Sequence, residues 1–159
     1  MIYITKSFIR TLIKEEKIKI IEPNNTIADS YLEKSQKSLV SAKTLLNIKN
    51  YDDAVALTYY SMYYSVLALL FKCGIKSENH SGTIILLKKI FEINNEEISY
   101  AKKERIDKQY YIDFKATDID VQAGIEAAEE FNSILKNKID TMQQKEIQDY
   151  FNRAKKLLF

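Results

Sequence analysis

Apolar residues recur along most of the chain at steps of three and four positions, the period of an amphipathic α-helix. Between Asp29 and Lys49 this stripe consists of Leu32, Ser35, Leu39, Ala42 and Leu46. A second long stripe consists of Val121, Ile125, Ala128, Phe131, Leu135, Ile139 and Met142. Thr117 and Asp120 resemble a capping box at its start. The pattern can be extended into one long final helix through Ile147, Phe151, Ala154 and Leu158.

The segment from Asp52 to Gly74 is predicted to form a central helix that is apolar around most of its circumference. Small residues follow one side of it, at Ala54, Thr58, Ser61, Ser65 and Ala68. Four tyrosines lie beside them, at Tyr59, Tyr60, Tyr63 and Tyr64. Such a helix belongs in the middle of a bundle or at a dimer interface. Because buried tyrosine hydroxyls need partners, the rings indicate either core packing or the lining of a groove.

The same helix carries no charged residue across the 18 positions between Asp53 and Lys72. A membrane span needs about 20 mainly apolar residues. Hydroxyl side chains interrupt this run, and its tyrosines lie in the middle rather than at the ends. We therefore expect a buried core helix and no membrane contact. The N-terminal residues carry charges throughout and lack the apolar core of a signal peptide, which favours a cytoplasmic protein.

Shorter segments complete the predicted architecture. A polar turn from Ser77 to Ser81 precedes a helix whose stripe is Ile84, Leu87 and Phe91. Residues 95–111 form a helix with a thin apolar stripe and several basic side chains. Residues 1–22 and 143–159 form amphipathic helical extensions that can pack together or against a second subunit. The prediction is one all-α domain over residues 1–159, an antiparallel helical bundle of four to five core helices plus terminal helices.

The composition supports an all-α fold and excludes several kinds of functional site. Three glycines and one proline argue against a sheet with many tight turns. One histidine and one cysteine cannot form a conventional zinc site, and the glycines are too far apart for a phosphate-binding loop. We therefore expect no metal and no cofactor. Cys73 can form no internal disulfide, which fits a reducing cytoplasm. The formal net charge of +2 neither indicates nor excludes nucleic-acid binding.

Three stretches carry a more specific pattern: SYLEKSQKSLVSAKTLLNIKNYDDAV, YYSMYYSVLALLFKCGIKSENHSGTIILLKKIF and ERIDKQYYIDF. Paired tyrosines, a leucine-rich run, a glycine and a His-Ser-Gly helix start follow in that order in the second stretch. Over residues 29–137 the chain resembles the HEPN domain family, small helical proteins often found beside minimal nucleotidyltransferases. The resemblance implies a helical homodimer that pairs with a nucleotidyltransferase in toxin–antitoxin-type modules. Many members cleave RNA without a metal.

The ribonucleases among them use an arginine and a histidine in an R-x4-6-H motif. Arg105 matches the arginine, and Tyr110 stands where the shortest spacing places the histidine. Tyrosine, with a pKa near 10, is a poor base at neutral pH, whereas histidine at about 6.5 is well suited. Arg105 and Tyr110 are the candidate catalytic residues, and His80 is either an alternative partner of Arg105 or part of a structural turn. The candidate binding residues are Tyr59, Tyr60, Tyr63, Tyr64, His80, Lys102 and Tyr111.

Three functions are compatible with these observations. The first is a weakly catalytic or non-catalytic protein that binds a nucleotide or RNA and acts with a small nucleotidyltransferase, because the motif lacks its histidine. The second is a metal-independent endoribonuclease toxin that uses Arg105 with Tyr110 or His80. The third is a helical dimerisation or adaptor protein whose basic side chains are incidental.

Overall fold

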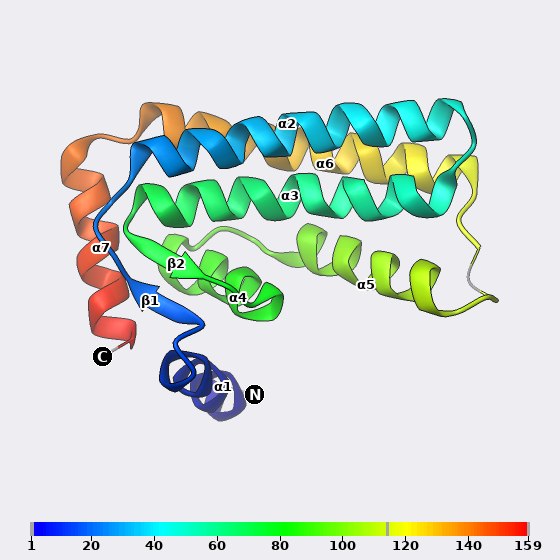
Figure 1. Cartoon of the computed structure of the whole chain (residues 1–159). Coiled ribbons are helices and arrows are strands. Elements are labelled where there is room, and N and C mark those ends of the chain that lie inside the picture. The colour runs from blue at the N-terminus through cyan, green and yellow to red at the C-terminus, as the bar shows by residue number, and fades with distance from the viewer. Residues whose placement is uncertain (1, 114, 159) are drawn as a thin grey trace.

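The structure is a computed structural model that describes residues 2–113 and 115–158. The elements in chain order are α1 (Ile2–Lys14), β1 (Ile18–Ile20), α2 (Asn25–Asn47), α3 (Tyr51–Lys72), β2 (Ile75–Ser77), α4 (His80–Phe91), α5 (Glu96–Tyr110), α6 (Asp118–Thr141) and α7 (Gln144–Leu158). Helices α2, α3 and α6 lie side by side, and α4 and α5 cover the opposite side of α3 (Figure 1). The predicted all-α helical bundle is confirmed.

Helix α3 occupies the centre of the bundle, and neighbouring helices cover its apolar surface. Among the described residues it is the one helix long and apolar enough to cross a membrane, and 78% of its 18-residue apolar window is buried inside the protein. A helix covered in this way packs against protein rather than lipid. The prediction of a buried core helix is confirmed.

The line of small residues on α3 brings α2 and α6 close to it. Ser35 of α2 donates a hydrogen bond to the Ser61 carbonyl oxygen at 2.7 Å, and its Oγ lies 2.8 Å from Ser65 Oγ. Asn132 of α6 accepts a hydrogen bond from Ser65 Oγ at 2.9 Å and donates one to Ser61 Oγ at 3.2 Å. These polar groups therefore satisfy one another where three helices meet, as burial requires.

A short two-stranded antiparallel sheet, formed by β1 and β2, joins the N-terminal segment to the bundle. It pairs Ile18 with Ser77, Lys19 with Lys76 and Ile20 with Ile75. The sequence pattern did not predict it, and residues 1–22 were expected to be helical. Strands of three residues are too short to show the alternation of apolar and polar residues that marks a strand in a sequence. Their pairing also depends on the turn after α3, where Ile21 N–H donates to the Gly74 carbonyl oxygen at 2.9 Å.

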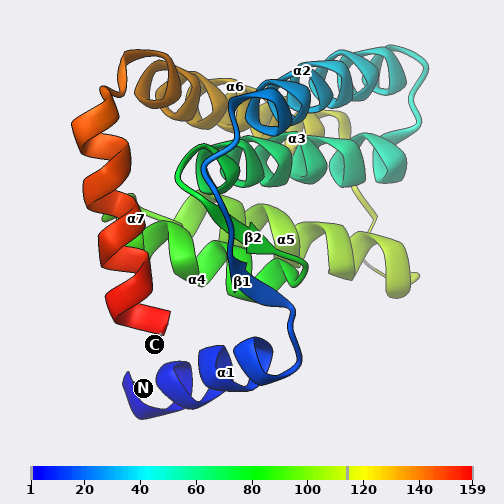
Figure 2. The same ribbon diagram turned by 60° about the vertical axis from the view of Figure 1, so that its left-hand side comes forward.

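The final helix is interrupted, so the extension of α6 through residue 158 as one helix is not observed. Helix α6 ends at Thr141, Met142 is extended, and α7 begins at Gln144. The apolar pattern contains the reason, because the step from Met142 to Ile147 is five residues rather than three or four. Helix α7 turns away from α6 and packs beside α4, and its end lies near α1 (Figure 2).

Gly74 occupies a position that no other residue fits well. Its φ is +75°, and an added Cβ would lie 2.6 Å from the Ile21 carbonyl oxygen and 2.8 Å from the Phe151 ring. We expect Gly74→Ala to lower the free energy of unfolding by about 2 kcal/mol or more, because the left-handed conformation alone costs an L-residue about 1–2 kcal/mol and the contacts add to it. Denaturant unfolding measures the change.

Gly124 in α6 is the matched control for this prediction. An added Cβ there meets only Thr58 Cγ2, at 3.8 Å. Because glycine inside a helix is about 0.8–1.0 kcal/mol less favourable than alanine, Gly124→Ala is expected to stabilise the protein or leave it unchanged. Equal effects of the two substitutions would contradict the turn that the structure assigns to Gly74.

Candidate functional site

Aromatic rings on α3 hold the chain's only histidine. His80 is the first residue of α4, and its ring stacks on Tyr63 with centroids 4.1 Å apart and planes 11° from parallel. Its Nδ1 lies 2.6 Å from the Tyr59 hydroxyl oxygen. Asn79, rather than His80, caps the helix, since its side-chain oxygen accepts a hydrogen bond from Gly82 N–H at 2.8 Å. The imidazole is therefore fixed by two tyrosines and takes no part in capping.

Arg105 approaches the same rings from α5. Its Nη1 donates a hydrogen bond to the Tyr60 hydroxyl at 3.0 Å. Its guanidinium carbon lies 5.2 Å from the ring centre of Tyr59 and 5.4 Å from that of Tyr60, within cation–π range. The buried Nε has no hydrogen-bond partner among the described residues. The neighbouring Glu104 lies 3.9 Å from Lys108 instead, so the guanidinium charge is held by ring faces rather than by a carboxylate.

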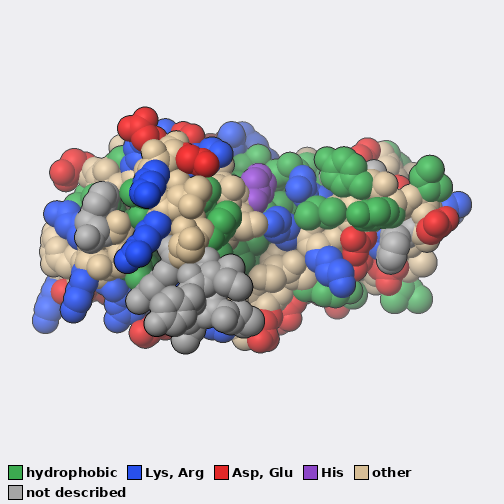
Figure 3. Space-filling view, turned by 90° about the horizontal axis from the view of Figure 1, so that it is seen from below, with side chains coloured by type: hydrophobic (Ala, Val, Ile, Leu, Met, Phe, Trp, Pro, Cys, Tyr) green, Lys and Arg blue, Asp and Glu red, His purple; other side chains and the backbone are tan. Residues whose placement is uncertain are grey.

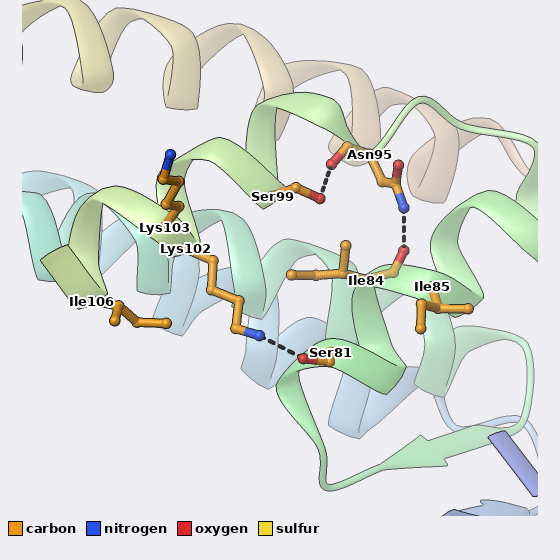
Figure 4. Close-up of a pocket in the computed structure, with 8 residues that line it drawn as sticks. All are labelled: Ser81, Ile84, Ile85, Asn95, Ser99, Lys102, Lys103 and Ile106. Carbon is orange, nitrogen blue, oxygen red and sulfur yellow. Dashed lines mark hydrogen bonds between the residues drawn. The ribbon is translucent and has the colours of Figure 1, made fainter. Parts of the chain in front are cut away.

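Lys102 lies one helical turn before Arg105, so both side chains leave the same face of α5. Its ammonium donates a hydrogen bond at 2.5 Å to the hydroxyl of Ser81, the residue after His80. Figure 4 shows Lys102 reaching from α5 across to Ser81 on α4. Figure 3 shows the histidine at the molecular surface, with positively charged side chains beside it. Two cations and an imidazole therefore converge where α3, α4 and α5 meet.

The electrostatics of this group favour an anion. Burial lowers the pKa of His80, and the charges of Arg105 and then Lys102 lower it further. Because histidine ordinarily titrates near 6.5, the imidazole is uncharged at neutral pH. Burial also lowers the pKa of Lys102, with a further contribution from Arg105. An anion bound between these groups would relieve their mutual repulsion.

Burial decides what the four predicted tyrosines can do. Tyr59 is 0% and Tyr63 is 6% exposed, so their ring faces cannot stack on a ligand and serve instead to hold other side chains of the site. Burial raises the pKa of both hydroxyls, so neither ionises near neutral pH. Tyr60 and Tyr64 are half-buried and stack on each other with centroids 6.0 Å apart. Of the four, only Tyr60 and Tyr64 have surface left for a ligand.

Tyr110 and Tyr111 lie at the C-terminal end of α5. Tyr110 is in the last turn of α5 and is 72% exposed. Five residues of α-helix turn through about 500°, which places Tyr110 about 140° around the axis from Arg105. Tyr111 follows the helix and is also exposed. The structure thus brings His80, rather than Tyr110, next to Arg105.

Sequence reasoning missed Ser81 and Asn79 as parts of the site. The signal for Asn79 was present, because asparagine before a helix is a favoured N-cap and sets where α4 begins. The contact between Ser81 and Lys102 joins residues that are 21 positions apart. It depends on how α4 and α5 pack, which the pattern along the chain does not encode.

Residues 28–139 match the HEPN domain family, and the chain belongs to that family. Two proteins of Methanocaldococcus jannaschii are similar to it. The protein named putative toxin MJ0142 is 41% identical over 68 residues, which are 43% of this chain and 46% of the relative. The protein named putative toxin MJ0605 is 33% identical over 85 residues, which are 54% of this chain and 63% of the relative. The chain thus spans about half of the first relative and under two thirds of the second.

Proposed function

We propose that the protein binds RNA or a nucleotide as part of a toxin–antitoxin-type module, with Arg105, Lys102 and His80 as its phosphate-binding site. The observation that carries this proposal is the convergence of two cations and a neutral imidazole at one place on the surface. Arginine recognises phosphate through paired hydrogen bonds, and lysine does so as a point charge. The names of the two relatives as toxins support the type of module.

We further propose a homodimer in the cytoplasm and a small nucleotidyltransferase as partner. Exposed apolar side chains at the junction of α5 and α6 support a contact surface. Tyr110 is 72%, Ile112 is 90% and Ile119 is 77% exposed. Apolar surface that remains exposed in one region often marks a protein interface. This surface lies at the end of α5, beyond Arg105, so a partner bound there leaves the phosphate-binding group accessible.

RNA cleavage without a metal is the second candidate, and the neutral imidazole beside Arg105 favours it. When the Tyr59 hydroxyl accepts a hydrogen bond from Nδ1–H of His80, Nε2 has a lone pair that can take the proton of a ribose 2′-hydroxyl. The 2′-oxygen then attacks phosphorus while Arg105 stabilises the charge on the phosphoryl oxygens. Lys102 supplies a proton to the departing 5′-oxygen. The products are a 2′,3′-cyclic phosphate end and a 5′-hydroxyl end.

The test is a titration of labelled single-stranded RNA with the purified protein in EDTA, at several salt concentrations. Each phosphate contact to a single strand adds about −0.7 to the slope of log K against log salt. Salt-dependent binding supports the proposed function, and inspection of the same RNA on a gel reports cleavage. Absence of binding to RNA and to nucleotides, together with a stable complex with a nucleotidyltransferase, would instead identify an adaptor.

A further inference from the structure

A groove between α4 and α5 begins at the contact between Lys102 and Ser81. Its volume is about 380 Å³, within the range of pockets that hold small ligands. Its lining consists of Ser81, Ile84, Ile85, Asn95, Ser99, Lys102, Lys103 and Ile106. Figure 4 shows these side chains coming from both helices, with Lys102 crossing from α5 to Ser81 on α4. The groove is therefore continuous with the group that contains Arg105 and His80.

The lining has an order that matches a nucleoside phosphate. Isoleucine side chains from both helices give the groove an apolar surface, and the charged residues that line it are both lysines. Asn95 Nδ2 donates a hydrogen bond to the Ile84 carbonyl oxygen at 2.9 Å, which leaves its Oδ1 as an acceptor. Along the groove the amide of Asn95, the apolar side chain of Ile84 and the ammonium of Lys102 follow one another, and Ile106 lies beyond Lys102 (Figure 4). The N–H groups at the edge of a base, the face of that base and a phosphate follow in the same order.

We propose that this groove holds the nucleoside next to the phosphate bound by Arg105, with its base against the isoleucines and its phosphate on Lys102. The inference rests on the proposed function. Asn95, the N-cap of α5, and Lys102 are seven residues apart, which corresponds to about 10 Å along the helix axis. That length and the volume of the groove suit one nucleoside. The groove therefore supplies a base contact that the buried tyrosines Tyr59 and Tyr63 cannot supply.

The test fills the groove without touching the cationic group. Ser99 is exposed, and its Oγ donates to the carbonyl oxygen four residues earlier, at 2.6 Å. Ser99→Trp is expected to weaken binding of a short single-stranded RNA about tenfold, comparable to the loss of one buried apolar contact. The substitution should weaken binding of the same ribose–phosphate chain without bases much less. Fluorescence anisotropy measures both affinities.

Ser30→Trp is the matched control. Ser30 is also exposed on a helix, and its Oγ donates to the carbonyl oxygen of Thr26 at 2.9 Å, but it lies on α2 and does not line the groove. This variant should bind both chains as the wild type does. Should Ser99→Trp unfold at a lower temperature than Ser30→Trp, Lys103→Glu on the exposed rim provides a second variant, again with weaker RNA binding expected.

The outcomes separate the two proposals. When Arg105→Ala weakens RNA binding but Ser99→Trp and Lys103→Glu do not, the groove proposal is overturned and the proposed function stands. When Ser99→Trp weakens the intact and the abasic chain equally, the groove does not hold a base. When the wild type binds no RNA, or Arg105→Ala binds as the wild type does, the proposed function fails and the groove proposal fails with it.

Discussion

Arg105→Ala is expected to weaken RNA binding by about 10- to 150-fold. A hydrogen bond to a charged group contributes about 1.5–3 kcal/mol, and each 1.4 kcal/mol corresponds to a factor of ten in affinity. The salt dependence should change as well, because one lost phosphate contact reduces the slope of log K against log salt by about 0.7. Titrations of labelled RNA at several salt concentrations measure both quantities.

Two variants control for this result. Arg105→Lys keeps the charge but loses the planar group that bonds to Tyr60, so it should keep the salt slope and recover only part of the affinity. Arg153→Ala removes an arginine of α7. The Nη1 of Arg153 donates to the Ile90 carbonyl oxygen at 2.8 Å and lies 3.2 Å from a carboxylate oxygen of Glu92, at the end of α4. The Arg153→Ala variant should bind RNA as the wild type does. An unchanged salt slope in Arg105→Ala would contradict the assignment of Arg105 to phosphate.

His80→Gln is expected to lower RNA cleavage in EDTA by about 10²- to 10⁴-fold, the usual contribution of one acid–base group. At neutral pH, where the imidazole of the free protein is uncharged, RNA affinity should fall much less than the cleavage rate, because the two cations remain. Gel analysis of end-labelled RNA measures the cleavage rate. A wild type that binds but never cleaves RNA would eliminate the ribonuclease candidate and leave the binding function.

Tyr110→Phe distinguishes the two catalytic partners that the sequence offered for Arg105. The substitution removes the hydroxyl of the residue that occupies the position of the histidine in the R-x4-6-H motif. Because Tyr110 is 72% exposed and turned away from Arg105 along α5, we expect no change in cleavage or binding. Loss of cleavage in Tyr110→Phe, with full cleavage in His80→Gln, would contradict the site described above.

The helices were predictable because their signals are local. The expected capping box at the start of α6 is present: Thr117 Oγ1 accepts from Asp120 N–H at 3.2 Å, and Asp120 Oδ2 accepts from Thr117 N–H at 3.1 Å. The apolar run of α3 likewise predicted its place in the core. The two-stranded β1–β2 sheet was not predictable, because its short strands are defined by pairing between residues far apart in the chain.

The candidate site was only partly predictable for the same reason. Arg105, Lys102 and the tyrosines of α3 were candidates from the sequence, and spacing along the chain offered Tyr110, beside the alternative His80, as the partner of Arg105. The helix turns that tyrosine away from Arg105. His80 lies 25 positions before Arg105 and reaches the same rings from another helix. The tertiary packing of α4 and α5 against α3 creates this proximity.

His80 gives the most direct test, because it is the only histidine in the chain and its imidazole gives one set of NMR signals in protein prepared without a histidine tag. Burial and the two nearby cations disfavour the imidazolium, so the free protein should titrate with a His80 pKa below 6.5. A bound phosphate favours the imidazolium, so RNA should raise this pKa. By linkage, RNA affinity should then increase as the pH falls through the His80 pKa of the complex towards that of the free protein.

The measurement is therefore a pH titration of the His80 imidazole signals, with and without single-stranded RNA. We expect a His80 pKa below 6.5 in the free protein and a higher pKa in the complex. Imidazole signals and a pKa that stay unchanged while RNA binds would exclude His80, Arg105 and Lys102 as the phosphate-binding site, because the RNA would then lie elsewhere on the protein.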